Sequence, residues 1–406
     1  MTPQHTLPAI DEGACLDTLA EMIRHKSYSE TEGELALVRW MVAEMERTGI
    51  RAEARPVPGG RLNAIGRWGA AGGGGRLLFN GHLDTNPATE GWTVDPWGGV
   101  RDDRFIYGIG VSNMKAGDAA SLCAVRTLIE AGVEIPGEVI LTYVVGELQG
   151  GIGTVAAIED GITADCFVNS EPTDLAALTM HAGAFVFTIH LTGNTRHLSK
   201  REEAVDAAQA AAWLAPRINA MTFSGAASDE HRSINRAHVG VMRAALGSEM
   251  LEWRAPQVAD VAYLKGSARY APGQSVEGVL ADIEALLGEA RAAFPGLATR
   301  LVHEREEGRP SMPPFEVARD EPVVRALADA YRAVRGAEQP VGAIRPPAFY
   351  GTDAAHLSGR LGIAGVVCGP GGKYNTMPDE RVGIADYLDM IRIYMRVILT
   401  ICSETG

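Results

Sequence analysis

Two polar side chains stand two residues apart at the end of an apolar run, in the segment Asn80-Gly81-His82-Leu83-Asp84-Thr85. Residues two apart in an extended chain point to the same side, so His82 and Asp84 are expected to lie together. A carboxylate beside an imidazole fixes its tautomer, as is common behind a histidine that binds a metal. A strand-end histidine satisfied by a local aspartate would give the same pattern without any chemistry. The pair alone leaves both interpretations open.

Three further polar segments follow in order along the chain, each after an apolar run or a loop. They are Gly108 to Lys115, Gly146 to Gly151 and Ser170 to Thr173. The second contains Glu147, whose pKa would rise if the side chain were buried among its apolar neighbours, as a general base near neutral pH requires. A glutamate at a strand end is otherwise most often solvated.

With these segments, the sequence resembles the zinc aminoacylase, carboxypeptidase G, acetylornithine deacetylase and succinyl-diaminopimelate desuccinylase family of metallopeptidases. The usual motifs of that family read GHxDT, GxGxxDMKGG, DEExGG, EPT and a late HTPDE. The resemblance extends over nearly the whole chain, including Trp92 to Trp97 and the motif Gly351-Thr352-Asp353-Ala354. It implies an α/β catalytic domain with a mostly parallel sheet and an inserted α+β dimerisation domain.

The resemblance also implies a role for each matching residue of the catalytic domain. His82 would bind a metal with Asp84 behind it, and Glu171 would be a further ligand. Glu147 would be the general base that takes a proton from the attacking water.

Three residues of the inserted segment match substrate-binding positions of the family. His197 would reach across a dimer and donate to the oxyanion that develops in the transition state. Arg269 would clamp a substrate carboxylate, for which its planar fork is suited, and Asn235 would add an amide to that site.

The sequence departs from the family pattern at three metal ligands. Asn113 stands where the family has a bridging aspartate, Leu148 replaces the second glutamate of DEE, and Thr376 takes the place of the late histidine. Of the three carboxylates that usually neutralise two divalent cations, only Glu171 remains, so we expect no two-metal centre. His82, Glu171 and Asn113 would then hold one zinc or manganese ion. An amide is a poor ligand, so a labile ion and no ion remain open as alternatives.

Apolar periodicity predicts the elements that position these residues. Two helices are expected over residues 14–50, followed by strands at 76–79, 139–145 and 166–169, with a helix at 116–131 between the first two strands. Strands that alternate with helices indicate a largely parallel sheet. Ligands bind such sheets at the carboxyl ends of the strands, which is where the polar segments lie.

From about Leu178 the pattern changes to alternating strands and two helices, which predicts an inserted α+β module. The expected strands lie near 185–191, 238–244, 261–270 and 298–304, and the expected helices at 204–218 and 276–293. After Gly308 the α/β pattern returns. We therefore predict a discontinuous catalytic domain of residues 1–178 and 308–406, and an inserted dimerisation or lid domain of residues 179–307.

Composition restricts the partners and the location. The chain has 406 residues and a formal net charge of -14, which repels phosphate backbones and anionic membranes, so we expect no nucleic-acid or membrane partner. No apolar run approaches the roughly 20 residues of a membrane span, and the N-terminus lacks a signal-peptide pattern. Five widely spaced cysteines suit reduced thiols better than a disulfide framework. These features predict a cytoplasmic protein.

The leading hypothesis is a homodimeric hydrolase that cleaves the amide (C–N) bond of a small N-acyl amino acid or related carboxylate with a degenerate, one-metal site. In a second hypothesis a metal-independent enzyme, either a lyase or an unusual C–N hydrolase, uses Glu147 and His197 for proton transfer. In a third, a non-catalytic protein binds a small acid in the inherited pocket. Four other histidines are expected to be structural: His181, His190, His238 and His356.

Overall fold

The structure is a computed structural model that describes residues 7–70, 72–252, 255–305 and 308–403. The chain forms two compact units. Unit 1 comprises Met1–Met180, Phe315–Pro347 and Thr352–Gly406, and unit 2 comprises His181–Pro314 and Ala348–Gly351. Unit 1 is therefore discontinuous in sequence. The catalytic and dimerisation roles expected for the two parts of the chain stay predictions.

An eight-stranded sheet forms the centre of unit 1. Its strands, in order across the sheet, are β1 (Arg51–Val57), β2 (Arg61–Gly69), β5 (Glu138–Val144), β3 (Arg76–His82), β6 (Cys166–Asn169), β15 (Ala364–Val367), β7 (Ala177–Leu178) and β14 (Val341–Gly342). The central strands β5, β3, β6 and β15 run parallel, whereas β1 and β2 form an antiparallel edge. Every residue of β5 is buried, as is usual for a strand covered on both faces. The mostly parallel α/β fold is confirmed.

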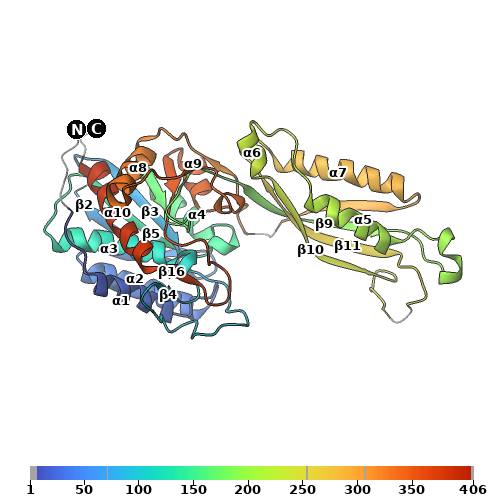
Figure 1. Ribbon diagram of the computed structural model, residues 1–406, viewed down its shortest axis with the longest axis horizontal. Coiled ribbons are helices and arrows are strands. Elements are labelled where there is room, and N and C mark those ends of the chain that lie inside the picture. The colour runs from blue at the N-terminus through green and yellow to red at the C-terminus, as the bar shows by residue number, and fades with distance from the viewer. Residues whose placement is uncertain (1–6, 71, 253–254, 306–307, 404–406) are drawn as a thin grey trace. The chain divides into compact units, whose positions relative to one another are not determined.

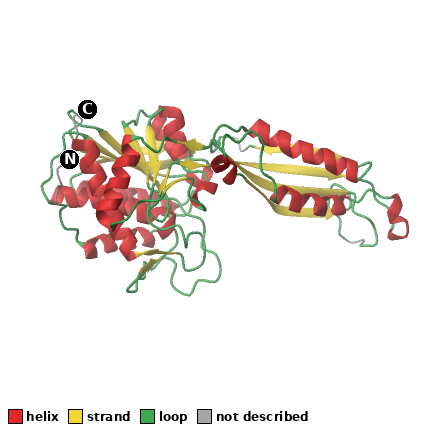
Figure 2. Ribbon diagram, turned by 45° about the horizontal axis from the view of Figure 1, so that its top comes forward, coloured by secondary structure: helices red, strands yellow, loops and turns green. Residues whose placement is uncertain are grey.

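Helices cover both faces of this sheet (Figure 1). They are α1 (Glu12–Arg24), α2 (Glu32–Arg47), α3 (Ala116–Glu130), α4 (Ile152–Glu159), α8 (Pro322–Arg335), α9 (Ala354–Leu361) and α10 (Ile384–Ser403). Successive residues of β3 point to opposite faces of the sheet. Asn80 donates to Thr154 of α4 on one face, and Gly81 lies against Asp118 of α3 on the other. Figure 2 shows the strands of unit 1 between these helices.

Local sequence signals explain where several helices begin and end. Asp11 caps α1 by accepting a hydrogen bond from the backbone N–H of Ala14. Gly336 and Gly362 adopt left-handed conformations that end α8 and α9. The remaining short strands are β4 (Phe105–Tyr107), paired with β16 (Arg381–Gly383), and β8 (Met180–His181) and β13 (Phe315–Glu316).

Unit 2 is a four-stranded antiparallel sheet with two helices on one face. The strands, in order across the sheet, are β10 (Arg236–Ala245), β11 (Val261–Tyr270), β9 (Gly183–Thr192) and β12 (Ala298–Glu304). The two helices on the face are α5 (Ala207–Asn219) and α7 (Val276–Ala293), and a third, short helix, α6 (Asp229–Ser233), precedes β10. Phe187, Ile189 and Leu191 of β9 pack against the helices and are fully buried, whereas Val186, which points to the other face, is exposed. The predicted α+β module is thus confirmed. No described helix in either unit is long and apolar enough to cross a membrane.

Candidate functional site

The imidazole of His82 lies buried at the carboxyl end of β3. Its Nδ1 is 2.8 Å from the backbone carbonyl of Asp84 and 3.6 Å from the Asp84 carboxylate, so the carbonyl is the closer acceptor. In the neutral imidazole, a proton donated from Nδ1 to this carbonyl would leave a lone pair on Nε2 for a metal ion. That nitrogen lies 3.2 Å from Oδ1 of Asn113 and 3.5 Å from Oε1 of Glu171. Three predicted metal ligands are therefore brought together.

The carboxylate of Asp84 connects His82 to the turn that carries Glu147. Its Oδ1 accepts from the backbone N–H of Gly146 at 2.8 Å and of Glu147 at 3.4 Å, and its Oδ2 accepts from Ser29 at 3.0 Å. Burial by itself would raise the pKa of Asp84, but the bond to His82 and its charge bring that pKa below its usual value. Asp84 is thus an ionised group that fixes both the imidazole and the neighbouring turn.

Glu147 sits on a glycine-rich turn between β5 and α4. Gly146, Gly150 and Gly151 all have positive φ angles, +79°, +81° and +79°. Only glycine adopts this conformation without strain, so the sequence itself dictates the sharp turn. The turn follows a buried strand and places the Glu147 carboxylate, which is partly exposed, next to His82 and Glu171.

Two side chains from distant segments hold this turn in place. His356 of α9 bonds through Nε2 to the carbonyl oxygen of Gly150 at 2.8 Å. Arg61 of β2 donates to Oε1 of Gln149 at 3.1 Å while its guanidinium forms a buried ion pair with Glu34. Sequence reasoning took His356 for a structural histidine, and no local signal links it to residue 150, because the contact spans 206 positions.

Ligand atoms of His82, Glu147 and Glu171 all lie within 4.8 Å of one another, which is close enough for one metal ion. Burial raises the pKa of Glu171 to about 7, and burial together with Glu171 raises that of Glu147 well above its usual value. Burial alone would lower the pKa of His82, but Glu171 and Asp84 raise it well above normal. The cluster has more carboxylates than positive charges, so a cation would be favoured there.

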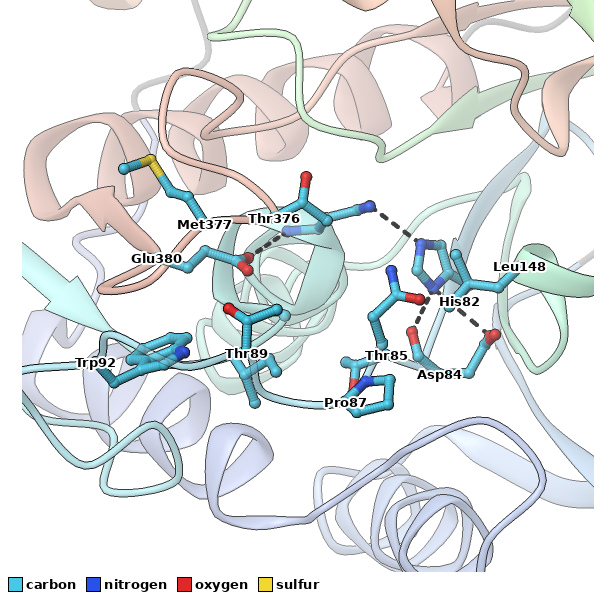
Figure 3. Close-up of a pocket in the computed structure, with 14 residues that line it drawn as sticks. His82, Asp84, Thr85, Pro87, Thr89, Trp92, Leu148, Thr376, Met377 and Glu380 are labelled. Carbon is cyan, nitrogen blue, oxygen red and sulfur yellow. Dashed lines mark hydrogen bonds and ion pairs between the residues drawn. The ribbon is translucent and has the colours of Figure 1, made fainter. Parts of the chain in front are cut away.

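The three departures from the family motifs lie around one pocket. Fourteen residues line it: His82, Asp84, Thr85, Asn86, Pro87, Thr89, Trp92, Ile109, Gly110, Asn113, Leu148, Thr376, Met377 and Glu380. Figure 3 shows His82, Asp84 and Leu148 on one side of this pocket and Trp92, Met377 and Glu380 on the other. The altered positions therefore face the volume next to His82.

Glu380 is a buried pocket residue that sequence reasoning did not single out. Its Oε1 accepts from the backbone N–H groups of Ser112 at 2.8 Å and Asn113 at 3.1 Å. Burial raises the pKa of Glu380 to about 7, although these donors oppose the rise. Glu380 therefore holds the loop that presents Asn113. Its place in the late Pro378-Asp379-Glu380 stretch was the available signal.

The other three predicted site residues belong to unit 2. His197 is exposed and lies 3.0 Å from the hydroxyl of Ser199, next to the short helical turn that it caps. Arg269 donates to the Ser267 hydroxyl at 2.9 Å.

Asn235 uses its amide inside unit 2. Its oxygen accepts from the backbone of Phe223 at 3.0 Å, and its nitrogen donates to Gln274 at 2.8 Å. The roles of Asn235, His197 and Arg269 in binding substrate stay predictions.

Comparisons with known proteins agree with this fold. The sequence profile of "Peptidase family M20/M25/M40" matches residues 78–400. A Bacillus subtilis relative named N-formyl-4-amino-5-aminomethyl-2-methylpyrimidine deformylase is 25% identical over 92% of this chain and 90% of its own length. Acetylornithine deacetylase of Proteus mirabilis is 30% identical over 47% of this chain, which spans about half (51%) of that enzyme. The crystal structure of aminopeptidase PepT from Bacillus cereus superposes with a TM-score of 0.75 at 19% identity, over 97% of this chain and 99% of that one.

Proposed function

The chain belongs to peptidase family M20/M25/M40, and we propose that it is a one-metal hydrolase that removes a small acyl group from the nitrogen of a small molecule. The observation that carries the proposal is the group formed by His82, Glu147 and Glu171 beside a pocket. The names of the two curated relatives, a deformylase and a deacetylase, both describe removal of a small acyl group. Removal of an acyl group from nitrogen breaks an amide C–N bond, which is the bond type expected from the sequence.

The donor set fits one divalent ion, zinc or manganese. Nε2 of His82 lies near a carboxylate oxygen of Glu171 and the amide oxygen of Asn113, and the negative charge of the surrounding carboxylates favours a cation. A second ion is not favoured, because Leu148 offers no ligand atom and Thr376 only a neutral hydroxyl. When bound, the ion would act as a Lewis acid that activates water and polarises the acyl carbonyl.

Glu147 would move the proton in the proposed reaction. Its raised pKa suits a base that accepts a proton from the attacking water and returns it to the amine nitrogen as the C–N bond breaks. Asp84 would keep both His82 and the Glu147 turn in position, since one carboxylate oxygen contacts both. His197 would donate to the oxyanion, and Arg269 with Asn235 would bind any carboxylate of the substrate, as the family resemblance implies.

The proposal is tested with zinc-loaded and manganese-loaded protein on a panel of N-formyl and N-acetyl amines. We expect Glu147→Gln to lower kcat about a hundredfold or more while the protein retains about one ion per chain by elemental analysis. Glu134→Gln, at an exposed position, is the control for removing a carboxyl group. Full turnover by Glu147→Gln would refute the role of the base, and loss of the ion would make Glu147 a ligand instead. Turnover that persists after chelation would favour the metal-independent alternative.

We also propose that unit 2 mediates homodimer formation. The strand β10 lies at an edge of its sheet and pairs with β11 alone among the described strands. Val241 and Met242 on this strand are 43% and 52% exposed, an apolar surface that pairing with a second copy would cover. Analytical ultracentrifugation should show a dimer that Met242→Glu weakens, and a monomeric native chain would contradict the proposal.

A further inference from the structure

The sheet of unit 2 has one face that its two long helices do not cover, called the open face below. The helices α5 and α7 pack on the other face, which contains Phe187, Ile189 and Leu191 of β9. Residues that alternate with these three along β9 point to the open face, and so do their partners on β11 and β12. The pairing of β10 with β11 extends the same face to the edge of the sheet.

The open face is rich in positive charge. Five cationic residues and one acidic residue of the four strands point to it: Arg236, Arg243, Lys265, Arg269, Arg300 and Glu304. Glu304 is the only carboxylate on this face within the four strands, all of whose residues the structure describes. The chain as a whole has a formal net charge of -14, so the cations are concentrated here against the overall balance.

Two arginines and two ring side chains form a row across the four strands. The pairs along this row are Arg243 with Tyr263, Tyr263 with His190, and His190 with Arg300. Neighbouring strands lie about 4.8 Å apart, so the two arginines begin about 14 Å apart. Their long side chains can lean toward each other over the two rings. Lys265 points to the same face two residues beyond Tyr263 on β11.

The cations of this row have no carboxylate partner in the described part of the chain. Arg243, Lys265 and Arg300 are all exposed, and none of them forms an ion pair there. Lys265 and Arg243 are diagonal neighbours across a strand pair, about 7–8 Å apart, where like charges repel. Burial lowers the pKa of His190, and the charge of Arg300 lowers it further, whereas Glu304 opposes the change. An anion bound over the row would relieve this repulsion.

The row is separate from the carboxylate site predicted at Arg269. Six residues of β11 separate Arg269 from Tyr263, which is about 20 Å along an extended strand. Salt screens exposed charges from one another beyond about 8 Å at physiological ionic strength. Arg236 pairs with Arg269 at that distant end, where its guanidinium stacks on the ring of Phe349 at 3.7 Å. The open face therefore carries two cationic regions.

The spacing of the cations indicates the kind of anion that would fit. Arg243, Lys265 and Arg300 stand on three different strands, so one phosphate or carboxylate group cannot reach all of them, whereas a linear chain of anionic groups can. The guanidinium fork suits phosphate oxygens. A long polyanion would extend beyond the open face and be repelled by a chain of net charge -14.

We propose that the open face of unit 2 binds a small molecule that carries a linear chain of phosphate groups. Arg243 and Lys265 contact one end of the chain, and Arg300 contacts the other. This site lies outside the group formed by His82, Glu147 and Glu171 and goes beyond the proposed hydrolysis.

Inorganic tripolyphosphate is the probe, titrated by calorimetry into the full chain after metal ions have been removed. Removal of the ions prevents the probe from binding through a metal. We expect one site per chain. Orthophosphate and citrate should bind at least about tenfold more weakly, because neither offers a linear chain of phosphates. Raising the salt concentration from about 50 to about 300 mM should weaken tripolyphosphate binding about tenfold, since the contacts are exposed.

Single substitutions connect the binding to the named residues. Arg243→Gln and Arg300→Gln should each weaken tripolyphosphate binding about tenfold, the loss of one charge-assisted contact. Arg217→Gln is the matched control, because it removes an exposed arginine of α5 on the covered side of the same sheet, and it should leave binding within twofold. Arg269→Gln should also leave binding within twofold.

Several outcomes would overturn the proposal. Equal weakening by Arg217→Gln would show attraction to positive charge in general, and equal affinity for orthophosphate would show that no chain of phosphates is recognised. Weakening by Arg269→Gln without weakening by Arg243→Gln would place the anion at the predicted carboxylate site. Tighter binding of a thymidine oligonucleotide or of anionic phospholipid vesicles would identify a different occupant. Turnover is not measured, so a chain that binds tripolyphosphate and hydrolyses no amide would contradict the proposed hydrolase alone.

Discussion

Replacement of Glu380 by glutamine should change how the stability of the protein depends on pH. The Glu380 carboxyl is 3% exposed, and burial raises its pKa from 4.5 to about 7. Glutamine keeps an Oε1 that can accept from the backbone N–H groups of Ser112 and Asn113, the two bonds that hold the loop. The substitution therefore removes the titration and preserves the acceptor.

The sign and size of the effect follow from proton linkage. Because the pKa is higher in the folded state, Glu380 binds its proton more tightly there, and this contribution to stability is complete below pH 4.5. It is lost as the pH rises toward 7. A difference of about 2.5 pKa units at about 1.4 kcal/mol each gives about 3 kcal/mol. The free energy of unfolding of the native chain should fall by about that amount relative to Glu380→Gln between pH 4.5 and 7.5.

Urea unfolding at several pH values, followed by tryptophan fluorescence, measures this difference. Four of the six tryptophans, Trp40, Trp68, Trp92 and Trp97, belong to unit 1, so the signal reports mainly on the unit that contains Glu380. Glu90→Gln removes an exposed carboxyl in the same unit and serves as the control. A stability difference between Glu380→Gln and the native chain that stays constant across this pH range would refute the reasoning.

Three other substitutions test the site and its support. His356→Ala should lower kcat by about tenfold with little change in KM or metal content, because it removes the hydrogen bond to the Gly150 carbonyl in the turn that carries Glu147. His356→Gln should recover part of the lost kcat, and unchanged kinetics of His356→Ala would show that the turn does not need this bond. Leu148→Glu with Thr376→His should raise bound zinc from about one to about two ions per chain by elemental analysis, and an unchanged content would contradict the one-metal explanation. Gly81→Ala should destabilise the fold by about 3 kcal/mol in urea unfolding, because a Cβ there would overlap the buried Asp118 carboxyl. Adding Asp118→Ala to this variant should restore most of the lost stability, and equal stability of the two single variants and the double variant would argue against the overlap.

Several features could be derived from the sequence because they depend on neighbouring residues. The helices of residues 12–24 and 32–47 follow apolar periodicity, and the turn around Glu147 follows from its glycines, which alone tolerate the required φ angles. The order of the polar segments after successive strands also placed His82, Glu147 and Glu171 at one edge of the sheet, since parallel strands share their carboxyl ends.

Other features needed the tertiary structure because they join segments far apart in the chain. Three such contacts depend on how the helices and strands pack. Leu148 and Thr376 line the same pocket, His356 bonds to the carbonyl oxygen of Gly150, and Glu380 accepts hydrogen bonds from the loop that contains Asn113. No periodicity or spacing encodes such pairings. Burial likewise sets the raised pKa values of the carboxyls, and it exists only once the sheet is covered on both faces. Residue types and local spacing thus determined which groups were present, whereas packing between distant segments decided which of them meet and how they are charged.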